Sequence, residues 1–204
     1  MTTVPMPAEG AVAIHRRTVD FQVFADGDGL TVLGVLTDTR PWAVGTGTVE
    51  TVHHMEMRVR VRSVDRTITA AEVDMEAFPH PECPGIVPAF AGLVGLQVAR
   101  GYTREVQSRF GGVRGCTHLE QLARSLGPVV VQAVTSARML AVHTGEAEDL
   151  LSSGGASGSP WARDSCHIWA EGGIADQKLA AGWRPGVGPY PSPALVTLRR
   201  TGES

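Results

Sequence analysis

The chain has 204 residues, of which 43% are hydrophobic and 19% are charged, and its formal net charge is −3. These values are ordinary for a soluble globular protein, and the charge balance gives no sign of a nucleic-acid partner or an anionic membrane surface. No apolar run is long enough to span a bilayer, the N-terminus lacks the pattern of a signal peptide, and three widely spaced cysteines do not indicate a disulfide framework, so we expect a cytoplasmic protein.

The first third of the chain predicts antiparallel β structure. Within 12–24, apolar residues at 19, 21 and 23 alternate with polar ones. Turn-forming residues follow at 25–29, and 30–36 is the returning strand, which is typical of a hairpin. A loop is expected over 38–47. The clearest strand covers 55–61, where methionine and valine alternate with charged residues, and its arginines should form a solvated face. A further strand is expected over 67–78, with an irregularity near its start.

The middle of the chain is predicted to be helical. Pro84 suits the first turn of a short helix, so Cys83 lies just before a helix start. Another short helix is expected within 101–110. The longest apolar pattern with helical spacing then runs over 118–142, with a kink at a Gly-Pro pair near its middle.

The start of this long helix contains residue types that can act as nucleophiles or metal ligands. Thr117 followed by Glu120 fits a capping box, so the helix should begin at His118. Cys116 then lies just before the helix, where free N–H groups and the positive end of the helix dipole favour a thiolate, the reactive and metal-binding form. A buried cysteine beside a helix cap is the plain structural alternative.

These elements together predict one α+β domain over residues 1–182, with an antiparallel sheet and helices packed on one of its faces. A serine- and glycine-rich loop is expected over about 151–160. Residues 183–204 are rich in glycine and proline and predict an extended tail.

Cysteines and histidines gather at the breaks between these elements. Thiolates and imidazoles together suit zinc or iron, and a protein site usually takes three or four of them. The candidate metal ligands are His53, His54, Cys83, Cys116 and Cys166. There is no short Cys-x-x-Cys pair, so three separate buried cysteines with surface histidines remain an equal alternative.

Two further roles are open near the long helix. Cys116 and His118 could act as a nucleophile and its base, although side chains two residues apart at a loop-to-helix junction need not face each other. Arg114 could bind a carboxylate or phosphate at the helix start, or it could be a salt-bridged loop residue.

Four motifs together resemble a bacterial family catalogued as domain of unknown function 2889. They are His53-His54-Met55 with Arg58, Cys83-Pro84, the run from Gly111 to Leu119, and Asp164-Ser165-Cys166-His167. The Arg-Gly-Cys-Thr-His-Leu part of the third motif is the most specific. The resemblance covers most of the chain, and the family name implies no activity.

The order of elements is also similar, more distantly, to U-type iron–sulfur cluster scaffolds. That resemblance implies a sandwich in which three loop ends converge, with His53 or His54, Cys83 and Cys116 at the positions of the three scaffold cysteines. A histidine replaces the first cysteine, and Gly115 stands where the scaffold has a histidine. Mixed histidine and cysteine ligands suit a mononuclear metal better than cluster assembly.

The leading hypothesis is therefore an enzyme that acts on a small organic molecule and holds zinc or non-haem iron by His53 or His54, Cys83 and Cys116. His118, Cys166 or Arg114 would complete the site or bind substrate. One alternative is a non-enzymatic metal or iron–sulfur carrier. Another is a metal-free enzyme with Cys116 as nucleophile. A homo-oligomer is possible in each case.

Overall fold

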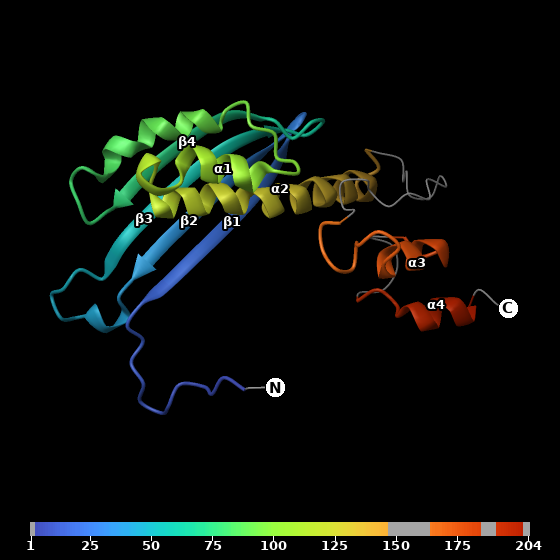
Figure 1. The fold of residues 1–204 in the computed structure, drawn as a ribbon, viewed down its shortest axis with the longest axis horizontal. Helices are drawn as coiled ribbons and strands as arrows, with labels where there is room; N and C mark the ends of the chain where they lie inside the picture. Colours follow the sequence, from blue (N-terminus) through green and yellow to red (C-terminus); the bar gives the residue numbers. More distant parts are fainter. Residues whose placement is uncertain (1–2, 147–163, 185–190, 202–204) are drawn as a thin grey trace. The chain divides into compact units, whose positions relative to one another are not determined.

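A computed structural model describes residues 3–146, 164–184 and 191–201, and the predicted loop at 151–160 lies outside them. The chain divides into two compact units, Met1–Thr135 and Ser136–Ser204. The first unit contains the sheet, whose four strands are drawn in Figure 1.

The sheet of the first unit is a four-stranded antiparallel meander in the order β1-β2-β3-β4. Its strands are β1 (Arg16–Asp26), β2 (Gly29–Thr39), β3 (Thr51–Arg62) and β4 (Ile68–Ala77). Each pairs with the next along the chain, as expected for short connections. The predicted irregularity also appears, because the β3–β4 register shifts between Arg60 and Val61.

Strand β2 is longer than the sequence predicted. The expected loop over 38–47 begins later, because β2 continues to Thr39 and the short 3₁₀ helix η1 (Pro41–Ala43) follows it. This extension moves Asp38 from a loop into the sheet. Its position keeps the period-two alternation of Leu30, Val32 and Leu36, all of which are buried.

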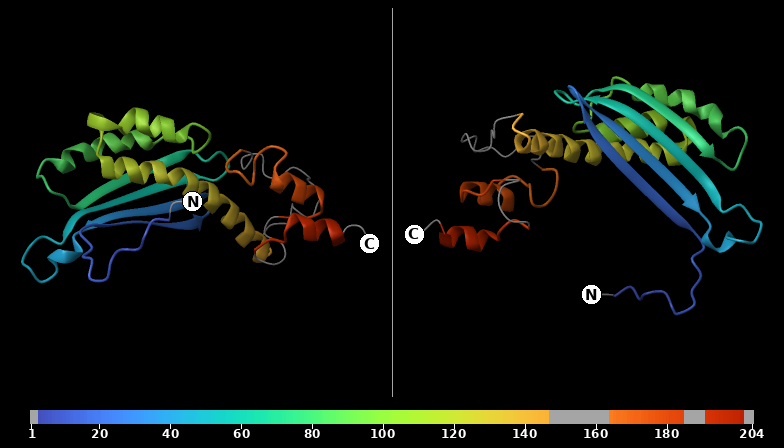
Figure 2. Two further views of the ribbon diagram at one scale, coloured as in Figure 1. Left: turned by 60° about the horizontal axis from the view of Figure 1, so that its bottom comes forward. Right: turned by 180° about the vertical axis from the view of Figure 1, so that it is seen from behind.

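A helical layer covers one face of the sheet, which confirms the predicted α+β fold (Figure 2). It consists of the 3₁₀ helix η2 (Cys83–Leu93), α1 (Tyr102–Phe110), the 3₁₀ turn η3 (Gly112–Arg114) and the first part of α2 (Thr117–His143). Tyr102 joins two of these helices, since its hydroxyl donates a hydrogen bond of 2.9 Å to the carbonyl of Ala123.

The start of α2 differs from the predicted capping box. The amide of Glu120 donates to the carbonyl of Cys116 at 2.8 Å, so Cys116 occupies the N-cap position and Thr117 is the first helical residue. The carboxylate of Glu120 pairs with Arg124, one turn along the helix, at 2.8 Å. Cys116 is thus closer to the helix than the sequence indicated.

The core lies between the apolar face of the sheet and the helices. On the sheet side, the alternating residues of β3 are almost completely buried: Met55, Met57, Val59 and Val61. On the helix side, α2 contributes Leu119, Leu122 and Leu126, each with 0% exposure. The opposite side of β3 carries the predicted solvated arginines, and these pair with acidic residues, such as Arg58 with Glu72 at 3.0 Å.

Truncating a core leucine of α2 should therefore destabilise the fold strongly. We expect Leu122→Ala to lower the free energy of unfolding by about 2–5 kcal/mol, because it removes buried methyl groups and leaves a cavity. Leu140→Ala in the same helix is the matched control, since Leu140 is 54% exposed. Urea unfolding measures both variants, and equal losses would contradict this assignment of the core.

Helix α2 is also long and apolar enough to cross a membrane by length and composition, which the sequence analysis did not anticipate. A core helix of a soluble protein passes the same test. The fully buried residues of α2 lie between Leu119 and Val130, where the helix covers the sheet. We therefore assign this part of α2 to the core of the first unit.

In its described residues, the second unit contains the end of α2 and two short helices, α3 (Ile174–Ala180) and α4 (Leu195–Thr201). Helix α4 corrects the prediction of an extended tail over 183–204. Glycine and proline dominate only the first part of that tail, and Leu195–Thr201 contains neither.

Candidate functional site

Three neighbouring strands place polar side chains in one row on the helix-covered face of the sheet. Arg17 of β1 pairs in register with Asp38 of β2, and Asp38 pairs in register with His53 of β3. Directly opposed residues of antiparallel strands point to the same face. The β register alone therefore brings together a cation, a carboxylate and an imidazole at one end of the sheet.

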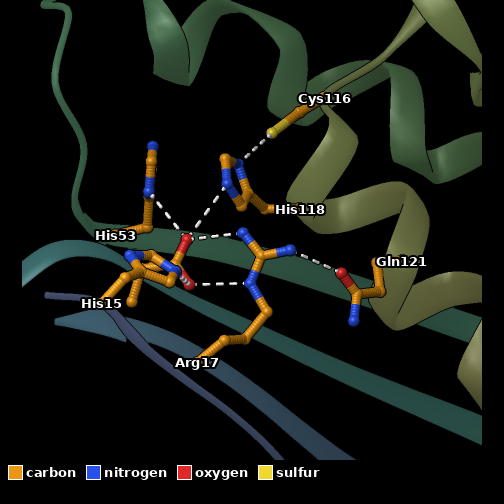
Figure 3. Close-up of polar contacts among 7 residues, drawn as sticks. His15, Arg17, His53, Cys116, His118 and Gln121 are labelled. Carbon is orange, nitrogen blue, oxygen red and sulfur yellow. Dashed lines mark hydrogen bonds and ion pairs between the residues drawn. The ribbon is translucent and has the colours of Figure 1, made fainter. Parts of the chain in front are cut away.

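Asp38 is the centre of this cluster, and Figure 3 labels its partners Arg17, His53 and His118. Its residue exposure is 1%, and a buried carboxylate requires partners. Arg17 binds it as a fork, with Nε donating to Oδ1 at 2.7 Å and Nη2 donating to Oδ2 at 2.6 Å. Nη1 of Arg17 also donates to Oε1 of Gln121 in α2 at 2.8 Å. Arg17 thus neutralises the carboxylate and ties the sheet to the helix.

Three histidines surround the same carboxylate. Oδ2 lies 3.1 Å from Nδ1 of His53 and 3.3 Å from Nε2 of His118, and Oδ1 lies 3.2 Å from Nε2 of His15. The rings of His53 and His118 stack with their centroids 3.8 Å apart. Both of these side chains are mostly buried, whereas the side chain of His15 is half exposed.

Cys116 lies on the far side of the His118 ring. Its Sγ is 3.7 Å from Nδ1 of His118, while Nε2 of the same ring faces Asp38. Figure 3 shows the resulting line from Cys116 through His118 to the carboxylate. We assign the neutral tautomer with the proton on Nε2, because Asp38 can only accept; the Nδ1 lone pair then faces the thiol.

The environment sets the charges of this line. The hydrogen bonds from Arg17 lower the pKa of Asp38 to about 2; burial opposes this, and the positive charges of Arg17, His118 and His15 support it. Burial also lowers the pKa of His118, and the neighbouring His53 and Arg17 lower it further. At neutral pH the cluster therefore holds an ionised Asp38 and an uncharged His118, which is the state that a general base requires.

The lowered pKa of Asp38 predicts a loss of stability in acid. The unfolded carboxyl titrates near 3.8 and the folded one near 2, so its contribution is complete above the first value and disappears as the pH falls through the second. The difference corresponds to about 2 kcal/mol. Urea unfolding should be measured at neutral pH and at pH values between 3.8 and about 2. The free energy of unfolding should fall more steeply with decreasing pH in the wild type than in Asp38→Asn. Parallel curves for the two proteins would contradict this prediction.

The structure brings together only some of the residues that the sequence indicated. His53, His118 and Cys116 join the cluster. His54 follows His53 on a strand and so points to the other face, where its Nδ1 lies 3.1 Å from Oγ1 of Thr37. Arg114 donates to the carbonyl of Ser108 at 2.9 Å, as a loop residue would.

The other two cysteines have different surroundings. Cys83 begins η2 and is partly exposed, and Cys166 is exposed in the second unit. Among the described residues, the groups of three side chains that could hold a metal ion are Asp38 with His53 and His118, and His54 with Glu56 and Glu76. Neither group contains a cysteine, so the predicted mixed set of His and Cys ligands is not assembled in this part of the chain.

Sequence reasoning missed Asp38, Arg17 and His15. The sequence does contain a pattern that marks Asp38 and Arg17. Continuing the alternation of β2 by two residues beyond Leu36 puts an acid on its apolar face, and the alternation of β1 likewise starts with Arg17. A charged residue at a core position of a strand usually needs a partner, which these two provide for each other.

Comparison with known proteins identifies a family without a described activity. No curated protein and no solved structure matches the chain. The model of the family described as "Protein of unknown function (DUF2889)" matches residues 15–132, a segment that begins at His15 and includes Arg17, Asp38, His53, Cys116 and His118. The match covers more than half of the chain, and the protein therefore belongs to the DUF2889 family.

Proposed function

We propose that the protein is an enzyme that acts on a small organic molecule through a covalent intermediate on Cys116. The observation that carries the proposal is the line Cys116–His118–Asp38, with separations of 3.7 Å and 3.3 Å. A nucleophile, a base and a carboxylate that orients the base are the parts that activated cysteine nucleophiles share. Contacts of this kind are often loose before substrate binds.

Acyl transfer or hydrolysis is the reaction class that these groups support. The Cys116 sulfur attacks the carbonyl carbon of an ester, amide or thioester while its proton passes to Nδ1 of His118. The leaving group departs with that proton, and a thioester to Cys116 remains. Water or another acceptor then attacks the thioester and gives its proton to His118. The C–S bond breaks, His118 returns that proton to the Cys116 sulfur, and the acyl group leaves as the acid or on the acceptor.

The neighbouring residues have positioning roles in this scheme. Asp38 holds His118 in the required tautomer and stabilises the imidazolium that forms. Arg17 keeps Asp38 ionised and fixed, because its fork occupies both carboxylate oxygens. His53 stacks on His118 and limits the rotation of its ring.

A burst experiment with p-nitrophenyl acetate tests the proposal. The wild type should release one equivalent of nitrophenol per chain in a fast phase, and mass spectrometry should locate the acetyl group on Cys116. Cys116→Ala should show no burst, while Cys83→Ala, the matched cysteine control, should keep it. Absence of a burst across a set of activated esters and thioesters, or acetylation at another residue, would refute the proposal.

A metal centre is the second candidate, and the short separation of three potential ligand atoms favours it. Potential ligand atoms of Asp38, His53 and His118 all lie within 4.8 Å of one another. Two histidines and one carboxylate suit zinc or non-haem iron, which would act there as a Lewis acid or activate water. We rank it second because Arg17 already neutralises Asp38, and because the ring of His118 separates Cys116 from that carboxylate.

Metal analysis separates the two candidates. A metal enzyme should contain at least roughly half a zinc or iron ion per chain after purification without added metal. The metal should disappear in His53→Ala and remain in Cys116→Ala. The thiol proposal instead predicts that a chelator leaves the burst unchanged. In either case, we expect a cytoplasmic protein whose partner is a small-molecule substrate.

A further inference from the structure

Strand β1 is a long open edge of the sheet. It has 11 residues without proline, and its pairing with β2 shows no register shift. The opposite edge strand, β4, receives backbone hydrogen bonds from the segment after η2, including one of 2.8 Å from Gly95 to Ile68. Among the described residues, β1 pairs only with β2. Proteins usually protect such edges, because free N–H and C=O groups can pair with another chain.

Apart from Gln121 of α2, which accepts a hydrogen bond from Arg17, the helical layer leaves the apolar side of this strand only partly covered. Val19, Phe21 and Val23 lie on the same face as the core, yet Val19 is 38% exposed, whereas Val32 of the neighbouring strand is fully buried. The ring of Phe21 lies over Gly34, where any Cβ would approach it to 2.5 Å, and it stays half-buried. This partly covered row, in which Phe21 and Val23 are half-buried, therefore continues the core face outward to the edge of the sheet.

We propose that two copies of the chain pair antiparallel through β1, around a two-fold axis at Phe21. This register is the one that uses all 11 residues, because Phe21 is the middle of Arg16–Asp26. Val19 of each copy then faces Val23 of the other, and the two Phe21 side chains face each other. A two-fold axis normal to the sheet puts both helical layers on the same face, where the joined apolar rows fill the gap between them.

The charges of β1 favour a second copy of this chain over an unrelated strand. In the proposed register, Arg16 of each copy faces Asp26 of the other, at both ends of the interface. Asp26 also contacts Arg60 of its own chain. Asp20 faces the neutral Gln22, so no two like charges are opposed. The strand is thus complementary to itself in charge and in apolar pattern, which a two-fold interface requires.

The mass of the full chain in solution tests this inference, using light scattering after size exclusion across a dilution series. The wild type should have twice the 21.6 kDa of one chain. Val19→Lys should convert it to a monomer, because each lysine would face an apolar Val23. Gln22→Lys is the matched control on the same exposed strand, and it should stay dimeric because the lysine would face Asp20 of the other copy.

Circular dichroism and thermal unfolding check that both variants fold. A monomeric wild type would overturn the inference. So would a Val19→Lys protein that remains dimeric, because the dimer would then use another surface, and so would equal dissociation by the two lysines. None of these outcomes depends on the reactivity of Cys116, so the dimer and the proposed function can fail separately.

Discussion

His118→Gln should slow the acylation of Cys116 by about 100-fold or more, since general-base assistance commonly contributes this much. Glutamine fits the helix and can still donate to Asp38, but it cannot accept the thiol proton at neutral pH. The burst rate with p-nitrophenyl acetate measures the effect. It should fall without a comparable change in the free energy of unfolding.

Two histidine variants serve as controls for this prediction. His54→Gln, on the adjacent position of β3, should leave the burst rate unchanged, because His54 lies on the other face of the sheet near Thr37. His53→Gln should have a smaller effect than His118→Gln, since His53 contacts the ring of His118 and Asp38. A burst rate that is the same in His118→Gln and in the wild type would show that His118 is not the base.

Asp38→Asn should cause the second large effect, a loss of about 3 kcal/mol of folding free energy. Removing one partner of a buried ion pair leaves the other charge uncompensated, which commonly costs about 3–5 kcal/mol. The side chain of Arg17 is partly exposed, so we expect a loss at the lower end of these values. The asparagine NH₂ group would also face donors from Arg17 and the histidines, which no rotation of the amide satisfies fully. Urea unfolding at neutral pH measures this loss.

A double-mutant cycle shows whether this loss belongs to the ion pair. The double variant Asp38→Asn/Arg17→Met has no uncompensated guanidinium, and the methionine replaces most of the aliphatic part of the arginine side chain. The double variant should lose at least about 1 kcal/mol less than the sum of the two single variants. Strict additivity would mean that the fork between Arg17 and Asp38 does not stabilise the fold.

The sequence predicted the fold well where periodicity is strong. The alternation of methionine and valine in β3 specified which face is buried, and the spacing of leucines did the same for α2. The end of β2 was harder, because Asp38 and the following Thr39 and Arg40 look like a loop when taken alone. A strand end depends on pairing with a neighbouring strand, which composition does not encode.

The site was predictable only in part, for a physical reason. Sequence motifs marked Cys116, His118 and His53; the structure places the two histidines against Asp38 and Cys116 against the opposite nitrogen of His118. The choice between His53 and His54 depended on the phase of β3, which a one-residue shift would reverse. The Arg17–Asp38 pair arises from strand register across 21 positions of sequence, so no local motif contains it.

Competition among the three cysteines for limiting iodoacetamide shows directly whether His118 activates Cys116. Exposure alone favours Cys166, because Cys83 and Cys116 are less exposed. Activation by His118 predicts instead that peptide mapping finds the first carbamidomethyl group on Cys116 at neutral pH, with or without a chelator, and that His118→Gln removes this preference. First modification at Cys166, with Cys116 reacting no faster than Cys83, would contradict the account.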